Sequence, residues 1–398
     1  MSGDLPNSDA ARVAMLAGLS ALGTETVSLR DAVGRYLALP EKASLDAPLF
    51  DAAAMDGWAV RSEDLLSCNA FATAGETAAG DEPPSTLRSG EARRIFTGAP
   101  LPPGADRVIE QERAVSSGNS VRFVSVAPRR HVRARGADFV HGQQLLPAGG
   151  RLDSWNLGLL AATGSHEVAV ARRPRVALIT MGDELVEPGA RLRPGAIYDS
   201  NGPALTASIE GWGGEVARRD RLRDDPALLA AAVRAASEVD LLLVVGGASV
   251  GRRDLAKPTL LSLGLDLQVA GIAMRPGKPT WFGRMPGGQR VLGLPGNPAA
   301  ALVAATLFLR PLLAAMQGGD PSIELRRATL AAPLPIAGMW ELWLRARSVP
   351  EGLVILEDQD TSFVTRLAAA DALIRRSPNA AAAQAGATVE VLPLDRLR

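Results

Sequence analysis

The feature that most constrains the fold of this chain is an alternation of short apolar runs with helical patterns between Pro174 and about Leu313. The β-rich runs are RVALIT, GEVARRD, DLLLVVGG and RVLGLPG, and helical patterns such as DPALLAAAVRAAS separate them. Strands that alternate with helices predict a parallel sheet with helices on both faces. Ligands of such sheets bind beyond the carboxyl ends of the strands, so a functional site is expected there.

The other segments show different patterns. Residues Ser8 to Leu22 predict an amphipathic helix capped by Ser8, because apolar residues recur at helical spacing. From about Ala47 to Ala137, short β-like runs alternate with Pro/Gly-rich turns, which indicates a small β-rich domain. A helix capped by Asp153 or Ser154 follows, and a compact β domain is expected from about Ile323. The pattern predicts a multi-domain α/β plus β protein.

Composition excludes several classes of function. Among the 398 residues, Lys+Arg and Asp+Glu both number 43, which argues against a general nucleic-acid or anionic-membrane binder. Cys68 is the single cysteine, so no intrachain disulfide can form and a cysteine-based metal site is not expected. The N-terminus does not resemble a signal peptide, and the longest apolar run, Ala299 to Leu309, is too short to span a bilayer. We expect a cytoplasmic protein without a membrane or nucleic-acid partner.

Polar residues and glycines follow the strands of the α/β segment. The candidates at these carboxyl ends are Asp183 and Glu184, Asp199, Ser200 and Asn201, the Gly246–Gly247 pair, and Asn297 as the cap of a helix from about Pro298. Because parallel strands end at one edge of a sheet, this clustering is the strongest indication of a site that the residues themselves give.

The glycine pair and a later pair of cations both suggest an anionic ligand. The loop after DLLLVV is neither a Walker A motif nor G-x-G-x-x-G, but adjacent glycines let backbone N–H groups converge on an anion. In MRPGKPTWFG, a Pro-Gly turn separates Arg275 from Lys278, which suits an oxyanion. An ordinary tight turn and a solvated turn remain the alternatives. His131, His141 and His166 are the three histidines of the chain; His131 and His141 are too far apart for helical metal-ligand spacing and are expected to be surface or core residues.

The motifs, in order, resemble the MoeA family of molybdopterin molybdenumtransferases, which are related to the C-terminal E domain of gephyrin. The matching stretches are FDAAAMDGWAV, IFTGAPLPPGAD, RARGADF, MGDELVEPG, IYDSNGPAL, VVGGASVGRRDLAKP, MRPGKPTWFG and GLPGNPAAA. They span about residues 27 to 310, and the match to the remaining residues is weaker.

The resemblance implies four domains and a homodimer. Domain I would be helical and discontinuous (1–46 and 139–172), domain II an inserted β-rich domain (47–138), domain III a three-layer α/β molybdopterin-binding domain (173–317), and domain IV a C-terminal β domain (318–398). The cleft of such a dimer would lie between domain III of one chain and domain II of the other. A molybdoenzyme or a cofactor-biosynthesis protein would be a further partner.

The resemblance also implies a reaction and its residues. Adenylylated molybdopterin and molybdate would give molybdenum cofactor and AMP, with Mg2+ as the metal. The implied catalytic acids are Asp56, Asp138, Glu184 and Asp254, and the implied metal ligands are Glu184, Asp224 and Asp254. A hard cation beside a pyrophosphate prefers such carboxylates. The implied substrate-binding residues are Thr97, Asp199, Ser200, Asn201, Gly246, Gly247, Ser249, Arg275, Lys278, Pro295, Gly296, Asn297, Arg345 and Ser362. Of these, Gly246, Gly247 and Ser249 would hold the pterin phosphate, and Arg275 and Lys278 would bind molybdate.

Some positions depart from the family pattern. Val244 and Val245 replace two hydroxyl residues before the glycine pair, Ala52 and Ala53 replace Asn-Ser, Arg275 replaces Lys, and Arg252 takes a position that is often acidic. The lost hydroxyls favour an alternative, a catalytically weakened MoeA-like protein that binds and delivers molybdenum cofactor, whereas the retained acids favour an active enzyme. The related adenylyltransferase is disfavoured, because that enzyme normally consists of the α/β domain alone.

Overall fold

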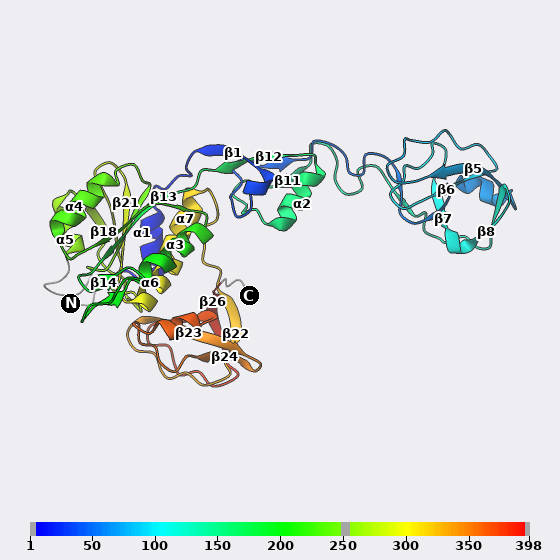
Figure 1. Ribbon diagram of the computed structural model, residues 1–398. Helices are drawn as coiled ribbons and strands as arrows, with labels where there is room; N and C mark the ends of the chain where they lie inside the picture. Colours follow the sequence, from blue (N-terminus) through cyan, green and yellow to red (C-terminus); the bar gives the residue numbers. More distant parts are fainter. Residues whose placement is uncertain (1–4, 248–254, 395–398) are drawn as a thin grey trace. The chain divides into compact units, whose positions relative to one another are not determined.

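The computed structural model of this chain describes residues 5–247 and 255–394. The chain divides into two compact units (Figure 1). The first unit comprises Met1–Leu39, Ala148–Asp153 and Val168–Arg398. The second comprises Pro40–Pro147 and Ser154–Glu167. The second unit is thus inserted into the first along the chain.

A six-stranded sheet forms the α/β part of the first unit. Its order is β16 (Glu215–Leu222), β13 (Arg175–Met181), β17 (Leu241–Val245), β21 (Arg290–Leu294), β20 (Trp281–Arg284) and β18 (Asp266–Val269). The first four strands are parallel to one another, which confirms the predicted parallel sheet. β20 runs antiparallel to β21, and β18 antiparallel to β20. This antiparallel edge was not expected from the sequence pattern.

Helices cover both faces of this sheet, as the alternating patterns predicted (Figure 1). The helices of one face are α1 (Ser8–Leu16), α3 (Asn201–Gly211), α6 (Pro298–Ala304) and α7 (Arg310–Met316), and those of the other are α4 (Pro226–Ala235) and α5 (Ala256–Ser262). Side chains of β17 alternate between the two cores: Leu243 and Val245 join the first, Leu242 and Val244 the second. A strand that is buried on both faces must be apolar throughout, which explains the run DLLLVV.

Helix α1 is shorter than the apolar spacing predicted. It ends at Leu16 instead of Leu22, because Ala17 turns to extended backbone and Gly18 has a φ of +60°. The cap is Asn7, whose side chain accepts a hydrogen bond from Ala10 N at 2.8 Å. Ser8, the predicted cap, is buried and donates from its hydroxyl to Glu341 at 2.9 Å.

The helix Pro298–Met316 is longer than the apolar run that the sequence shows. Among the described residues it is long and apolar enough to cross a membrane, but 78% of its apolar window is buried inside the structure. A π-helical turn, Ala305–Leu309, joins α6 to α7. Pro311, which has no N–H to donate and whose ring crowds the preceding turn, accounts for this irregularity. The helix is therefore a core helix of the α/β part. Burial identifies it as such, whereas the expectation that the apolar run is too short to span a bilayer does not hold for the whole helix.

The C-terminal part of the first unit contains a second six-stranded sheet. Its strands are β19 (Met274–Arg275), β23 (Glu341–Val349), β25 (Ala372–Arg376), β26 (Thr388–Pro393) and β22 (Arg326–Thr329) in order, with β24 (Gly352–Ile355) paired to β23. β19 comes from the α/β part of the chain and pairs parallel with the start of β23. A short helix, α8 (Val364–Ala368), precedes β25.

The second unit is built around a six-stranded sheet of mixed direction. Its strands, in order, are β7 (Arg107–Glu110), β4 (Gly57–Val60), β6 (Glu91–Ile95), β5 (Phe71–Thr77), β9 (Ser120–Phe123) and β8 (Ala114–Ser117). The same unit contains α2 (Ser154–Ala162), which buries only Leu160. Trp155 at its start is 84% exposed.

Candidate functional site

A cavity of about 690 Å³ lies at the carboxyl ends of the parallel strands. The loops after β13, β17 and β21 line it, together with the first turns of α3 and α6. The sequence-predicted residues that line it are Glu184, Asp199, Ser200, Asn201, Asp224, Gly246, Gly247, Pro295, Gly296, Asn297 and Ser362. The fold thus brings together one group of the predicted residues. Ser249 and Asp254, also predicted for this site, lie outside the described residues.

The glycine pair lets three loops meet at this cavity. Gly246 has a φ of +89°, and a Cβ atom there would lie 2.4 Å from the carbonyl oxygen of Met181. At Gly247 the φ is +62°, and a Cβ atom would lie 3.2 Å from Ala256 Cβ. Only glycine fits the first position, because a side chain would collide with backbone. The N–H of Gly246 donates to Leu294 O at 3.2 Å and so holds β17 against β21. The sequence pattern predicts that the N–H groups of the glycine pair face an anion, whereas this N–H already has a protein partner.

Asp199 lines the cavity, but its carboxylate is already satisfied by protein groups. It is 1% exposed and accepts hydrogen bonds from Thr180 Oγ1 at 2.9 Å and from Gly202 N at 2.8 Å. Arg219 Nη2 lies 3.3 Å away. A buried carboxylate with these donors fastens the start of α3 to the sheet. Asn201 adds a second tie, since its side-chain amide donates to Gly296 O at 2.6 Å.

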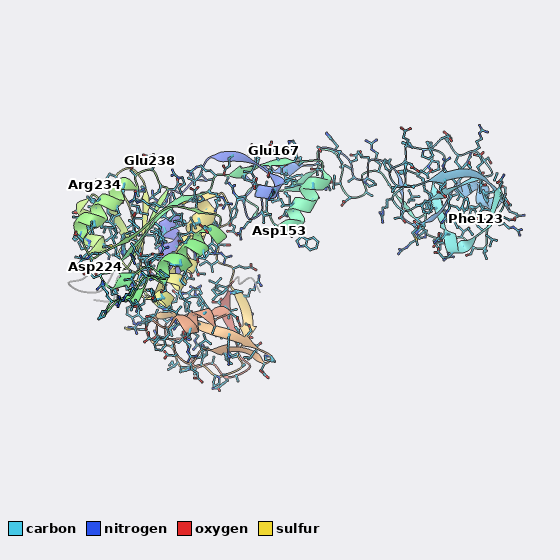
Figure 2. All side chains as sticks on the ribbon, in the orientation of Figure 1. Phe123, Asp153, Glu167, Asp224, Arg234 and Glu238 are labelled. Carbon is cyan, nitrogen blue, oxygen red and sulfur yellow. The ribbon has the colours of Figure 1, made fainter. Side chains whose placement is uncertain are left out.

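Glu184 and Asp224 lie where two cavities meet. Both line the larger cavity and also a neighbouring cavity of about 490 Å³. Asp224 lies between β16 and α4 and is labelled in Figure 2. The neighbouring Asp183 has a different environment, because its carboxylate pairs with Arg223 at 3.2 Å. For Glu184, no hydrogen bond or ion pair of the carboxylate is found with any other described residue.

These two carboxylates fit Mg2+ better than a metal held by protein alone. Within residues 5–247 and 255–394, no group of three or more His, Cys, Asp or Glu side chains is placed to hold a metal ion. Mg2+ is commonly held by one or two carboxylates together with waters and substrate phosphates. Glu184 and Asp224, which face the same cavities, are such a pair.

The C-terminal part supplies residues that the sequence pattern did not indicate. Asn297 Nδ2 donates to Thr361 Oγ1 at 2.8 Å, and Ala299 N donates to Thr361 O at 2.9 Å, so this loop covers the start of α6. The hydroxyl of Ser362 donates to Asp360 Oδ1 at 2.6 Å. Hydrogen bonds from Ser362 lower the pKa of Asp360. Thr361 could not be identified from sequence, because its contact with Asn297 is long-range.

Arg345 is a predicted oxyanion ligand that does not line the cavity. Its side chain is 1% exposed, and its Nη1 donates to Asp360 O at 3.0 Å. Gln359 Oε1 accepts from its backbone N at 3.0 Å. Nη2 is buried and has no hydrogen-bond partner among residues 5–247 and 255–394, and burial lowers the pKa of the guanidinium. A buried guanidinium with an unpaired donor is suited to an anion.

Arg275 and Lys278 also lie outside the cavity lining, although Pro279 belongs to it. Both cations are exposed and lie against one aromatic ring. The guanidinium carbon of Arg275 is 5.4 Å from the centroid of Trp340, and Lys278 Nζ is 4.7 Å from it. Trp340 was not predicted as a site residue, because it lies 62 positions beyond Lys278 in a segment without a matching motif.

The second unit holds the predicted residues Asp56, Thr97 and Asp138. Asp56 Oδ1 accepts from both Thr97 N and Thr97 Oγ1 at 2.8 Å. These hydrogen bonds hold the pKa of Asp56 below its ordinary value. Asp138 is exposed, and its backbone N–H donates to Ala47 O at 2.9 Å. Asp56 and Thr97 therefore form a pair, whereas Asp138 is placed by backbone contacts.

The two valines before the glycine pair have different surroundings. Val244 packs in the core on the α4 and α5 face of the sheet, whereas Val245 lines the cavity. Val245 is therefore the replacement that changes the lining. Ala52 and Ala53 form strand β3 (Ala52–Ala53) and are buried in the second unit.

Three family models match successive parts of this chain. Residues 7–164 match the family described as "MoeA N-terminal region (domain I and II)". Residues 177–315 match "Probable molybdopterin binding domain", and residues 327–394 match "MoeA C-terminal region (domain IV)".

Individual proteins show the same similarity. A molybdopterin molybdenumtransferase of Nostoc sp. is 40% identical over 305 residues, which cover 74% of this chain and 70% of that protein. One of Haemophilus influenzae is 37% identical over 298 residues, which cover 74% and 73%. A crystal structure of a molybdopterin biosynthesis MoeA protein from Pyrococcus horikoshii is 32% identical and superposes with a TM-score of 0.82, covering 99% of this chain and 100% of that chain.

Proposed function

The chain belongs to the MoeA family of molybdopterin molybdenumtransferases, and we propose that it inserts molybdenum from molybdate into adenylylated molybdopterin. Activity as a transferase that inserts molybdenum into molybdopterin follows from the family. We propose in addition the adenylylated form of the substrate, Mg2+ as the metal, and the residues that act. The observation that carries it is the cavity at the carboxyl ends of the strands, where Glu184, Asp224 and the Gly246–Gly247 loop meet.

The proposed reaction hydrolyses the adenylyl link. Water attacks one phosphorus of the phosphoanhydride and gives up a proton, and the bridging P–O bond breaks. AMP is released, and the molybdenum cofactor keeps its own terminal phosphate. Mg2+, held by Glu184 and Asp224 with Asp254, would neutralise charge on the phosphates. One carboxylate oxygen of Glu184 would serve the metal, and the other would accept the proton of the attacking water.

The remaining predicted residues divide between binding and positioning. Asp199 and Asn201 shape the cavity, because their side chains are tied to Gly202 and Gly296. Arg275 and Lys278 would bind molybdate, and the unpaired Nη2 of Arg345 supports a role in holding an anion. Asp56 and Asp138 remain proposals as catalytic acids. We also propose the division into domains at 1–46 with 139–172, 47–138, 173–317 and 318–398.

A homodimer is part of the proposal. Helix α2 has an apolar sequence, SWNLGLLAA, yet buries only Leu160, and Trp155 is 84% exposed. Such a surface is typical of an interface between subunits. Trp155→Lys should convert the dimer to monomer in sedimentation experiments, while Arg122→Glu, a change of charge elsewhere in the same unit, should not. Dimers in both variants, or monomers in the wild type, would contradict this surface.

The test of function is release of AMP. Purified protein with adenylylated molybdopterin, Mg2+ and molybdate should release AMP and yield cofactor that activates a cofactor-free molybdoenzyme. Glu184→Gln should reduce the rate by about 10²-fold or more, as expected for loss of a group acting on the reacting atoms. Glu238→Gln is the matched control, because Glu238 precedes β17 at the other end of the strand and is exposed (Figure 2).

The lining by Val245 favours one alternative function. Tight binding of the pterin without AMP release would show a protein that holds finished molybdenum cofactor for a molybdoenzyme or a cofactor-biosynthesis partner. Val245→Thr restores a hydroxyl at a replaced position that lines the cavity, with little change in volume. If that variant releases AMP faster than the wild type, the low rate of the wild type is caused by Val245.

A further inference from the structure

We propose that Trp340 is a positioning residue that holds Arg275 and Lys278 side by side for an oxyanion. The inference rests on the proposed function of these two cations as ligands of molybdate. The distances from the ring centroid of Trp340 to the Arg275 guanidinium carbon and to Lys278 Nζ are 5.4 and 4.7 Å. Both are within the range in which a cation is attracted to an aromatic ring.

The two cations need such a support. Each side chain is exposed, and neither makes an ion pair with another described residue. Because both lie close to the same centroid, their charges are at most about 10 Å apart and repel each other. Long exposed side chains also occupy many rotamers, which lowers the fraction of molecules in which both cations are placed to bind the same anion. A shared ring offsets both effects, since its face attracts each cation to one place.

The backbone fixes the position of Trp340 relative to Arg275. Glu341 pairs with Met274, and Leu342 pairs with Arg275, in the parallel ladder of β19 and β23. Trp340 lies in a bend immediately before β23, so this pairing brings the segment that contains Trp340 next to Arg275.

The turn between the cations returns Lys278 to the same ring. Thr280 N donates to Gly277 O at 2.9 Å, and Ile272 N donates to Lys278 O at 3.0 Å. Gly277 has a φ of +109°, and a Cβ atom there would lie 2.3 Å from Met274 Cε. One backbone hydrogen bond thus spans Lys278, and the other is accepted by the carbonyl of Lys278, so the backbone of the turn is fixed.

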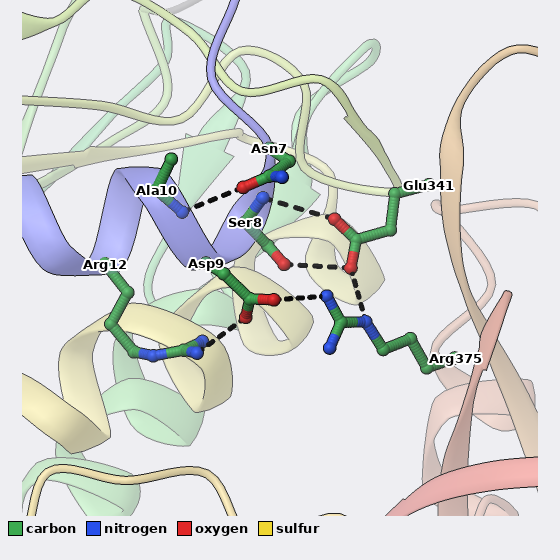
Figure 3. Close-up of polar contacts among 7 residues, drawn as sticks. All are labelled: Asn7, Ser8, Asp9, Ala10, Arg12, Glu341 and Arg375. Atoms are coloured by element: carbon green, nitrogen blue, oxygen red, sulfur yellow. Dashed lines mark hydrogen bonds and ion pairs between the residues drawn. The ribbon is translucent and has the colours of Figure 1, made fainter. Parts of the chain in front are cut away.

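The opposite face of β23 anchors this strand. Glu341, next to Trp340, is 2% exposed and accepts from Ser8 Oγ at 2.9 Å and from Arg375 Nε at 2.8 Å (Figure 3). The partly exposed Trp340 side chain is not part of that network. Substitution of Trp340 should therefore leave the strand in place, which makes the side chain testable by itself.

The test distinguishes the effect of the aromatic ring from the effect of apolar volume at position 340. It uses the AMP-release assay with saturating adenylylated molybdopterin and varied concentrations of molybdate. Trp340→Leu should raise the KM for molybdate about tenfold, because two cation–ring contacts are lost, while kcat and the affinity for adenylylated molybdopterin stay unchanged. Trp340→Phe keeps a ring face and should stay within about threefold of the wild type. Met339→Leu, at an exposed neighbour, is the control and should change nothing.

The outcomes separate this inference from the proposed function. If Arg275→Ala and Lys278→Ala raise the KM for molybdate and Trp340→Leu does not, the positioning role is wrong and the cation assignment stands. If none of the three variants changes that KM, the assignment of molybdate to these cations is wrong. If Trp340→Phe is as defective as Trp340→Leu, or if kcat falls in parallel, the indole supports the structure and does not position the cations.

Discussion

Replacing Glu341 by glutamine should loosen helix α1 from the C-terminal sheet. Figure 3 shows the carboxylate of Glu341 between the start of α1 and Arg375. It accepts from Ser8 N at 3.2 Å, from Ser8 Oγ at 2.9 Å and from Arg375 Nε at 2.8 Å. A glutamine amide has one acceptor oxygen instead of two and adds two donors. Its nitrogen would therefore face either Ser8 or Arg375, each of which is a donor here.

The size of the effect follows from burial. Removing one partner of a buried ion pair costs about 3–5 kcal/mol. The lower end applies, because Arg375 also bonds Asp9 at 2.6 Å and its side chain is 19% exposed. A loss of about 3 kcal/mol in the free energy of local opening corresponds to roughly 150-fold faster exchange of the α1 amide hydrogens, at 1.4 kcal/mol for each factor of ten.

Hydrogen exchange followed by mass spectrometry measures this opening directly. Peptides from residues 8–16 should exchange faster in Glu341→Gln, while peptides from β13 and β17 should not change. Glu357→Gln is the control, because Glu357 is an exposed carboxylate in the same C-terminal part. If the α1 peptides exchange at the wild-type rate, the apolar contacts of Ala11 and Met15 hold the helix without the polar network, and the reasoning is wrong.

Three further outcomes are expected. Gly246→Ala should cost about 2 kcal/mol or more and abolish pterin binding, because its Cβ atom meets Met181 O, whereas Gly211→Ala, with no atom within 4 Å, should raise the melting temperature slightly. Asp199→Ala should lower the free energy of unfolding in urea by about 3 kcal/mol, since it orphans buried donors, while Glu184→Gln should leave it unchanged. Burial raises the pKa of Asp9, but hydrogen bonds from Arg375 and Arg12 outweigh it and lower the pKa below 3.8. The stabilisation is therefore complete above pH 3.8 and lost as the pH falls through the lowered pKa, so the melting temperatures of wild type and Asp9→Asn should converge at low pH and separate above it.

Features that depend on local pattern could be predicted from the sequence. Strands β13, β17 and β21 are buried on both faces, so their apolar runs identify them, and the loops after them contain the cavity residues. β19 could not be predicted, because it forms by pairing with β23, which lies far along the chain. β20 was missed although it pairs with β21 across the short turn at residues 285–289, because the turn signals in MRPGKPTWFG hide its four residues. Local signals therefore located the sheet and its functional edge, but not the antiparallel extension.

Long-range partners decided the rest of the site. Asn7 and Ser8 are both good caps, and the choice between them depends on Glu341, which no local pattern reveals. Asp199 was predicted as a ligand of substrate, yet its carboxylate contacts Thr180 and Gly202. A sequence shows that a carboxylate follows a strand, but whether it is free depends on which donors the fold brings to it.

The network at Ser8 has a consequence for how the chain is synthesised. Glu341 follows Ser8 by 333 positions, and translation at about 5–20 residues per second separates the two by roughly 17–67 s. The second unit, whose last residue is Glu167, can fold during that interval, whereas α1 has already left the ribosome and its partner has not yet been made. The first helix to emerge is thus among the last to be packed, since its apolar residues Ala11 and Met15 stay available to chaperones until the helices and strands of the α/β part up to Met316 have been made, and the polar network of Ser8 forms later still.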